Sequence, residues 1–134
     1  MSLFSSIPLL VIVVLVYFVV ELIAPGTSGA VVLALKLPSG ADMALRGGDL
    51  IIGLGLVLLY GEILKSTRTS SASVIDHVTS MGLFVTCLVL FIVWSAAGTG
   101  TFFLITLMTL VDVVAGFTVT ISAARRDVDV ATLQ

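Results

Sequence analysis

The residue of this sequence best suited to chemistry is Asp112, an acid in the middle of a long apolar run. The run extends from Thr101 to Ala124, and Asp112 is its one charged residue. An aspartate at the centre of a membrane helix costs roughly 2.5 to 3.5 kcal/mol to insert. We therefore expect the Asp112 side chain to face protein or water rather than lipid.

Helical spacing around Asp112 predicts a contact between two apolar runs. Thr109, Asp112 and Gly116 fall on one stripe of small and polar residues. A short Gly-Thr-Gly connection centred on Thr99 joins this run to the preceding one, and it is short enough to require an antiparallel helix pair. Thr86 and Asp112 are each thirteen residues from Thr99. The counting therefore predicts that the Thr86 hydroxyl reaches the Asp112 carboxyl, with Thr86, Thr109 and Asp112 as the candidate intramembrane polar site.

Two interpretations of Asp112 follow from that geometry. In the first, the carboxyl is protonated, because no Lys or Arg lies at its depth, and it acts as a hydrogen-bonding clasp between helices. In the second, it is a proton- or cation-binding acid of a channel or carrier. The structural interpretation is the one we favour.

Three further charges fall near the ends of apolar runs. Glu21 lies about one turn before the end of the first run. Glu62 and Lys65 have the i, i+3 spacing of a helical ion pair, which is worth a few tenths of a kcal/mol on a surface. We interpret Glu21, Glu62 and Lys65 as interfacial charges, with Lys65 extending toward the lipid headgroups.

Catalysis, metal binding and nucleic-acid binding find little support. His77 is the one histidine and Cys87 the one cysteine, and ten helical residues, about 15 Å, separate them. They cannot form a nucleophile and base pair within one chain, and a metal site needs more ligands. The largest basic cluster is the pair Arg125 and Arg126. We therefore predict no enzyme activity, no metal, no cofactor and no nucleic-acid partner.

The composition identifies the environment in which these residues lie. The chain has 134 residues, of which 59% are hydrophobic and 10% charged, and its mean hydropathy is +1.29. A soluble domain carries about 25% charged residues. The composition therefore predicts an integral membrane protein in contact with the lipid bilayer, with 1–134 as a single domain.

Four apolar runs predict four transmembrane helices, over residues 7–24, 49–65, 74–97 and 101–124. A cleavable signal peptide is the alternative for the first run, but no basic residue precedes the run and no A-x-A-like site follows it. We expect this helix to be retained. In the second run Asp49 is the predicted N-cap, and three glycines predict a close-packing surface: Gly53, Gly55 and Gly61.

The segment between the first two runs has a different pattern. Leucines alternate with small or charged residues on both sides of Pro38, Ser39 and Gly40. This alternation predicts a β-hairpin over residues 31–46, in which 33–37 pair with 42–46 and Pro38 occupies turn position i+1. An interfacial helix is the alternative, but the Pro-Ser-Gly sequence would break it at its middle.

The basic residues predict an orientation. If both termini are inside, four basic residues lie on the cytoplasmic side: Lys65, Arg68, Arg125 and Arg126. The two others, Lys36 and Arg46, lie on the exterior side, and the positive-inside rule favours this orientation. The hairpin would then face the exterior and the Ser/Thr-rich loop around Thr69 the cytoplasm. We expect a bacterial inner-membrane protein that acts as a structural or accessory subunit, in a homo-oligomer or a larger complex. The alternative is a small oligomeric channel or carrier that uses Asp112.

Overall fold

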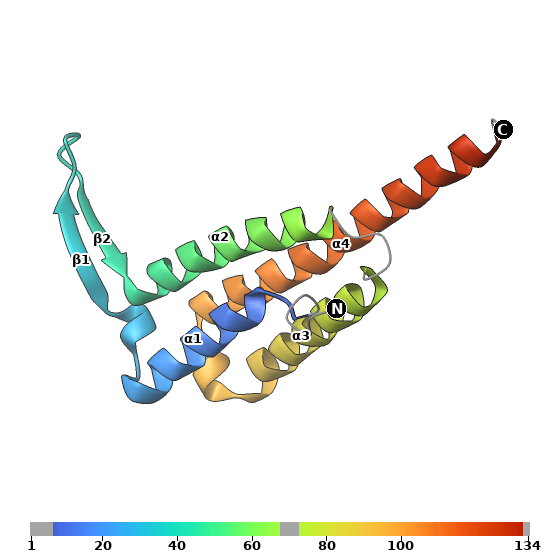
Figure 1. Cartoon of the computed structure of the whole chain (residues 1–134). Helices are drawn as coiled ribbons and strands as arrows, with labels where there is room; N and C mark the ends of the chain where they lie inside the picture. The colour runs from blue at the N-terminus through green and yellow to red at the C-terminus, as the bar shows by residue number, and fades with distance from the viewer. Residues whose placement is uncertain (1–6, 68–72, 133–134) are drawn as a thin grey trace.

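The computed structural model describes residues 7–67 and 73–132, and its elements alternate in direction along one bundle (Figure 1). The described part contains four α-helices: α1 (Leu10–Ile23), α2 (Gly47–Ser66), α3 (Ser73–Val93) and α4 (Gly100–Thr132). A hairpin of β1 (Val31–Lys36) and β2 (Asp42–Arg46) connects α1 to α2, and there are two short 3-10 helices, η2 (Thr27–Gly29) and η3 (Ser95–Ala97). Residues 68–72, within the predicted Ser/Thr-rich loop, lie outside the described residues.

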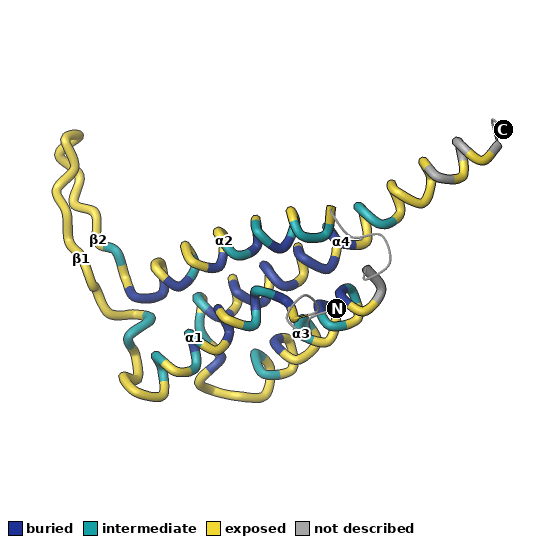
Figure 2. The backbone as a smooth tube through the Cα atoms, in the orientation of Figure 1, coloured by how far each residue is buried: buried dark blue, intermediate teal, exposed yellow. Residues whose placement is uncertain are grey.

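The core lies where the other three helices pack against α4. Figure 2 shows buried positions along the inward sides of the helices, whereas the hairpin and the far end of α4 are exposed. Tyr17 of α1 and Phe102 and Ile105 of α4 are fully buried at this centre. The outward surfaces of the helices carry large apolar side chains that are more than half exposed, among them Leu15, Leu22, Leu56, Val57, Val78, Ile92 and Val114. An apolar exterior around a packed interior is what contact with lipid requires.

Three helices are long and apolar enough to cross a membrane: Gly47–Ser66, Ile75–Val93 and the Gly100–Arg126 part of α4. These spans identify a small membrane protein. The predicted fourth span over residues 7–24 is not confirmed, because α1 has only 14 helical residues. Such a helix is about 21 Å long, less than the roughly 30 Å of the hydrocarbon core.

The predicted β-hairpin is confirmed. Its strands pair antiparallel, with Leu35 opposite Met43 and Lys36 opposite Asp42. Pro38 and Ser39 form the turn, closed by a 2.8 Å hydrogen bond from the Gly40 amide to the Leu37 carbonyl. Gly40 has a φ of +86°. Glycine adopts this left-handed conformation without strain, so the Pro-Ser-Gly sequence suits the turn that it forms.

The connection between α3 and α4 differs from the prediction. The third helix ends at Val93 rather than at residue 97, because Trp94 has an extended backbone and residues 95–97 form η3. The Trp94 ring stacks on Phe18 of α1 with centroids 4.8 Å apart. Helix α4 continues to Thr132, eight residues beyond the predicted end, because hydropathy marks the membrane-spanning part of a helix and not the helix itself.

The start of α2 also differs from the prediction. The helix begins at Gly47, so Asp49 is the third helical residue and not the N-cap. Its carboxylate accepts a 2.8 Å hydrogen bond from the Arg46 amide, which satisfies a donor at the helix start. Gly47 and Gly48 form the first turn of α2 and pack on the backbone of η2.

The fold places the start of α1, the end of α2 and the distal part of α4 at one end, and the hairpin at the other (Figure 1). The four-to-two distribution of basic residues predicts that the first of these ends is cytoplasmic. A topology reporter fused at Gln134 should therefore report the cytoplasm, and one inserted in residues 36–46 the exterior. Cytoplasmic signal from the hairpin insertion would contradict this orientation.

Candidate functional site

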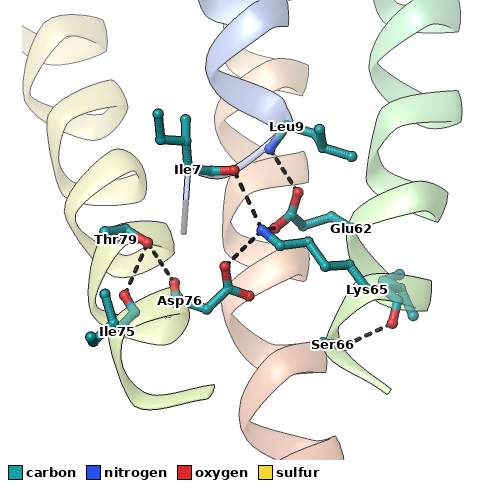
Figure 3. A network of polar contacts seen from close by, with 9 residues as sticks. Ile7, Leu9, Glu62, Lys65, Ser66, Ile75, Asp76 and Thr79 are labelled. Atoms are coloured by element: carbon teal, nitrogen blue, oxygen red, sulfur yellow. Dashed lines mark hydrogen bonds and ion pairs between the residues drawn. The ribbon is translucent and has the colours of Figure 1, made fainter. Parts of the chain in front are cut away.

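A network of charged side chains joins α2 to α3 inside the bundle (Figure 3). Lys65 of α2 lies between two acids, with its Nζ 3.0 Å from Glu62 Oε1 and 2.8 Å from Asp76 Oδ1. The Glu62 side chain is 2% exposed and that of Asp76 10%. The predicted i, i+3 pair of Glu62 and Lys65 is therefore present, but Glu62 is buried and Asp76 from a second helix completes it.

Glu62 also holds the beginning of α1. The Leu9 amide donates a 2.6 Å hydrogen bond to Glu62 Oε2, and Lys65 Nζ lies 3.4 Å from the Ile7 carbonyl. The first amides of a helix have no partner within that helix and carry partial positive charge, so a carboxylate there is favourable. The network therefore fixes the start of α1 against α2.

Asp112 lies beside this network. It is 6% exposed, and its carboxyl forms a hydrogen bond with the hydroxyl of Ser80, which is 5% exposed on α3. Glu62, Lys65 and Asp76 are near enough to interact electrostatically with Asp112. As expected, Asp112 faces protein and links α4 to α3.

The predicted partner of Asp112 is wrong. Thr86 is exposed, and its hydroxyl donates a 2.8 Å hydrogen bond to the Gly82 carbonyl within α3. The prediction counted from Thr99, whereas the connection runs from Trp94 to Thr99 and its midpoint lies near Ala97. This shift moves the position opposite Asp112 from Thr86 back toward Ser80.

The other residues of the predicted α3–α4 contact also have partners different from those predicted. Thr109 is 1% exposed, and its hydroxyl donates to the Thr106 carbonyl of its own helix at 2.7 Å. A side chain at Gly116 would meet the His77 ring, whereas Gly82 has open space around it. The close approach of α3 to α4 at Gly116 therefore accommodates the His77 ring.

Glu21 lies at the hairpin end and takes no part in the charge network. Its two carboxylate oxygens accept hydrogen bonds from the Gly26 amide at 2.8 Å and the Ser28 amide at 2.9 Å. Glu21 thus secures the turn between α1 and the hairpin.

Sequence reasoning gave no role to Tyr17, which fastens α1 to the α3–α4 connection. Tyr17 is fully buried, and its hydroxyl donates to the Ala96 carbonyl at 2.8 Å and lies 2.6 Å from Thr99 Oγ1. Thr99 in turn accepts a 3.1 Å hydrogen bond from the Phe102 amide, as an N-cap does. The available signal was a lone hydroxyl in the middle of an apolar run.

The charge network is closed. Among the residues that the structure describes, every buried side-chain nitrogen and oxygen has a hydrogen-bond partner. A surface groove of about 440 Å³ lies between α1 and the α3–α4 connection and is lined by Leu15, Phe18, Val19, Glu21, Leu22, Pro25, Trp94 and Ala96. A second groove lies on the distal part of α4 and a third between α3 and α4, and Glu62, Lys65, Asp76 and Asp112 line none of these three.

Over residues 7–67 and 73–132, no group of three or more His, Cys, Asp or Glu side chains is arranged to hold a metal ion. The arrangement joins the helices through ion pairs and hydrogen bonds. No protein-family model matches the chain, and comparison with curated proteins and with solved structures finds no significant match.

Proposed function

We propose that this protein is a structural or accessory subunit of a membrane assembly, in the cytoplasmic membrane of a bacterium. The observation that supports the proposal is the closed network around Lys65. Glu62 is committed to Lys65 and the Leu9 amide, Asp76 to Lys65, and Asp112 to Ser80. A transport site needs polar groups that face a pathway and exchange their partners, whereas these groups hold the fold together.

The surface offers a position for a partner helix. The 440 Å³ groove beside α1 is apolar apart from Glu21 and includes the aromatic rings of Phe18 and Trp94. Helix α1 is shorter than the membrane is thick, so this side of the bundle presents the least helical surface to lipid. A partner or a second copy that packs here would cover the groove.

A second candidate function is proton- or cation-coupled transport through an oligomer. The observation that favours it is the ratio of acids to bases, since three buried acids surround one lysine: Glu62, Asp76 and Asp112 around Lys65. In an environment of low polarity the excess negative charge must be neutralised, by a proton or by a cation.

Replacement of Asp112 by asparagine tests whether assembly depends on ionisation of this carboxyl. Asparagine has nearly the same shape and still forms a hydrogen bond with Ser80, but it cannot ionise. For an accessory subunit we expect Asp112→Asn to leave assembly unchanged, with the same stoichiometric complex as the wild type in native mass spectrometry of the tagged protein extracted from its own membrane. Thr109→Ala, which removes a buried hydroxyl about one helical turn before Asp112 on α4, is the matched control. Loss of the complex in Asp112→Asn alone would contradict the proposal.

A further inference from the structure

The hairpin has two chemically different faces. On one face the paired side chains are large and apolar: Leu33 opposite Leu45, and Leu35 opposite Met43. On the other they are small or charged: Ala34 opposite Ala44, and Lys36 opposite Asp42. We call the first set, Leu33, Leu35, Met43 and Leu45, the apolar face of the hairpin.

Within residues 7–67 and 73–132, the outer part of the apolar face has no cover. Leu33 is 46% exposed, Leu35 47% and Met43 38%, and Figure 2 shows the hairpin exposed except at the base of β2. A two-stranded ribbon is at best marginally stable in water unless other groups cover its apolar side. The hairpin therefore needs an environment outside the chain.

The hairpin is held crosswise to the helices at the end of the bundle (Figure 1). Its base is fixed by a 3.0 Å hydrogen bond from the Gly47 amide to the Ala30 carbonyl. Gly47 and Gly48 also pack closely on the backbone carbonyls of Thr27 and Ser28. Membrane-spanning helices tilt on average only about 20° from the membrane normal, so a ribbon crosswise to them extends along the membrane surface.

The depth of the hairpin follows from the length of α2. This helix has 20 residues, or about 30 Å, which matches the thickness of the hydrocarbon core, and it begins directly after β2. The hairpin thus lies at the boundary between acyl chains and headgroups. Deeper insertion is excluded, because both edges of a two-stranded sheet carry backbone groups that need water.

We propose that the apolar face of the hairpin rests on the lipid bilayer, with Leu33, Leu35 and Met43 in contact with acyl chains and with Lys36 and Asp42 facing the headgroups and water. Leu45, next to the bundle, is the one strand residue that is half-buried, which indicates that this face turns toward the helices. At the membrane–water interface, acyl chains cover the apolar side chains and water reaches the backbone groups at the two open edges of the hairpin. This inference depends on the membrane-spanning helices and not on the accessory role.

Two adjacent positions on opposite faces test the proposal. Two variants are made in a Cys87→Ala background, Leu35→Cys and Ala34→Cys. The new cysteine of each is labelled with an environment-sensitive fluorophore, and the protein is reconstituted in phosphatidylcholine vesicles. We expect a lipid with a quencher at the top of its acyl chain to quench the label at position 35 at least about twofold more than the label at 34. Aqueous iodide should quench the label at position 34 more than the label at position 35. A matching elution profile and helix content of the labelled proteins verifies the fold.

The other outcomes overturn the proposal. Equal access of iodide to both labels would place the hairpin in water. Equal quenching of both by the lipid would mean that it is immersed without a preferred face. Protection of position 35 from both quenchers would show that a second copy of the chain, the one protein present in the vesicles, covers this face instead of lipid.

Discussion

Replacement of Lys65 by methionine is expected to lower the free energy of unfolding strongly. The variant keeps the length of the side chain but leaves Glu62 and Asp76 buried without their counter-charge. Removal of one partner from a buried ion pair costs about 3 to 5 kcal/mol, because the remaining charge is uncompensated. The loss should appear in the free energy of unfolding of the purified protein in detergent micelles, followed by circular dichroism.

The chain supplies a control and a rescue for this experiment. Lys36→Met removes an exposed lysine from the hairpin and should change the free energy of unfolding by well under about 1 kcal/mol. Neutralisation of both acids, by Glu62→Gln and Asp76→Asn, should restore most of the stability that Lys65→Met removes. A loss in Lys65→Met no larger than that in Lys36→Met would show that the network does not hold the helices.

Substitution of alanine for Gly48 is expected to have the second-largest effect. A Cβ atom at Gly48 would lie 2.8 Å from the Ser28 carbonyl oxygen and would also clash with the Thr101 hydroxyl. The carbonyl belongs to the backbone and cannot rotate away, so the start of α2 must shift relative to η2 and α4. Overpacking of this kind costs about 1 to 3 kcal/mol.

Gly53→Ala is the matched control for Gly48→Ala, because the two glycines share α2 and a Cβ atom at Gly53 meets open space. Alanine is the better helix former, so this variant should gain up to about 1 kcal/mol. The same substitution is thus predicted to have opposite signs at two positions five residues apart in one helix. Equal changes in the midpoint of thermal unfolding would contradict the packing that we describe.

The sequence was most informative where local chemistry decides the structure. The alternation around Pro38 predicted the hairpin, because a period of two and a turn sequence are both local. The spacing of Glu62 and Lys65 likewise predicted their ion pair. Of the three glycines predicted to pack closely in α2, Gly55 meets Met108 and Gly61 meets Leu9, whereas Gly53 meets nothing. The presence of glycine alone does not tell which face of the helix is covered.

The sequence was least informative where two distant segments meet. Asp76 joins Lys65 from another helix, and no spacing within one helix could have predicted that contact. The predicted partner of Asp112 was wrong because the prediction depended on where the α3–α4 connection turns. Helix α3 ends at Val93, and the Trp94 ring stacks on Phe18. The predicted end of α3 was about one helical turn too late, and this error was enough to predict Thr86 instead of Ser80 as the residue opposite Asp112.

The most direct test of the closed network is ion flux through the purified protein in vesicles. Proton flux in a pH gradient and uptake of Na⁺ and K⁺ are compared with protein-free vesicles across a range of pH. Because Glu62, Asp76 and Asp112 are committed to partners within the bundle, we predict no flux above the protein-free level at any pH. Flux in the wild type that disappears in Asp112→Asn, while the oligomeric state is unchanged, would contradict the accessory role and establish Asp112 as a transport site.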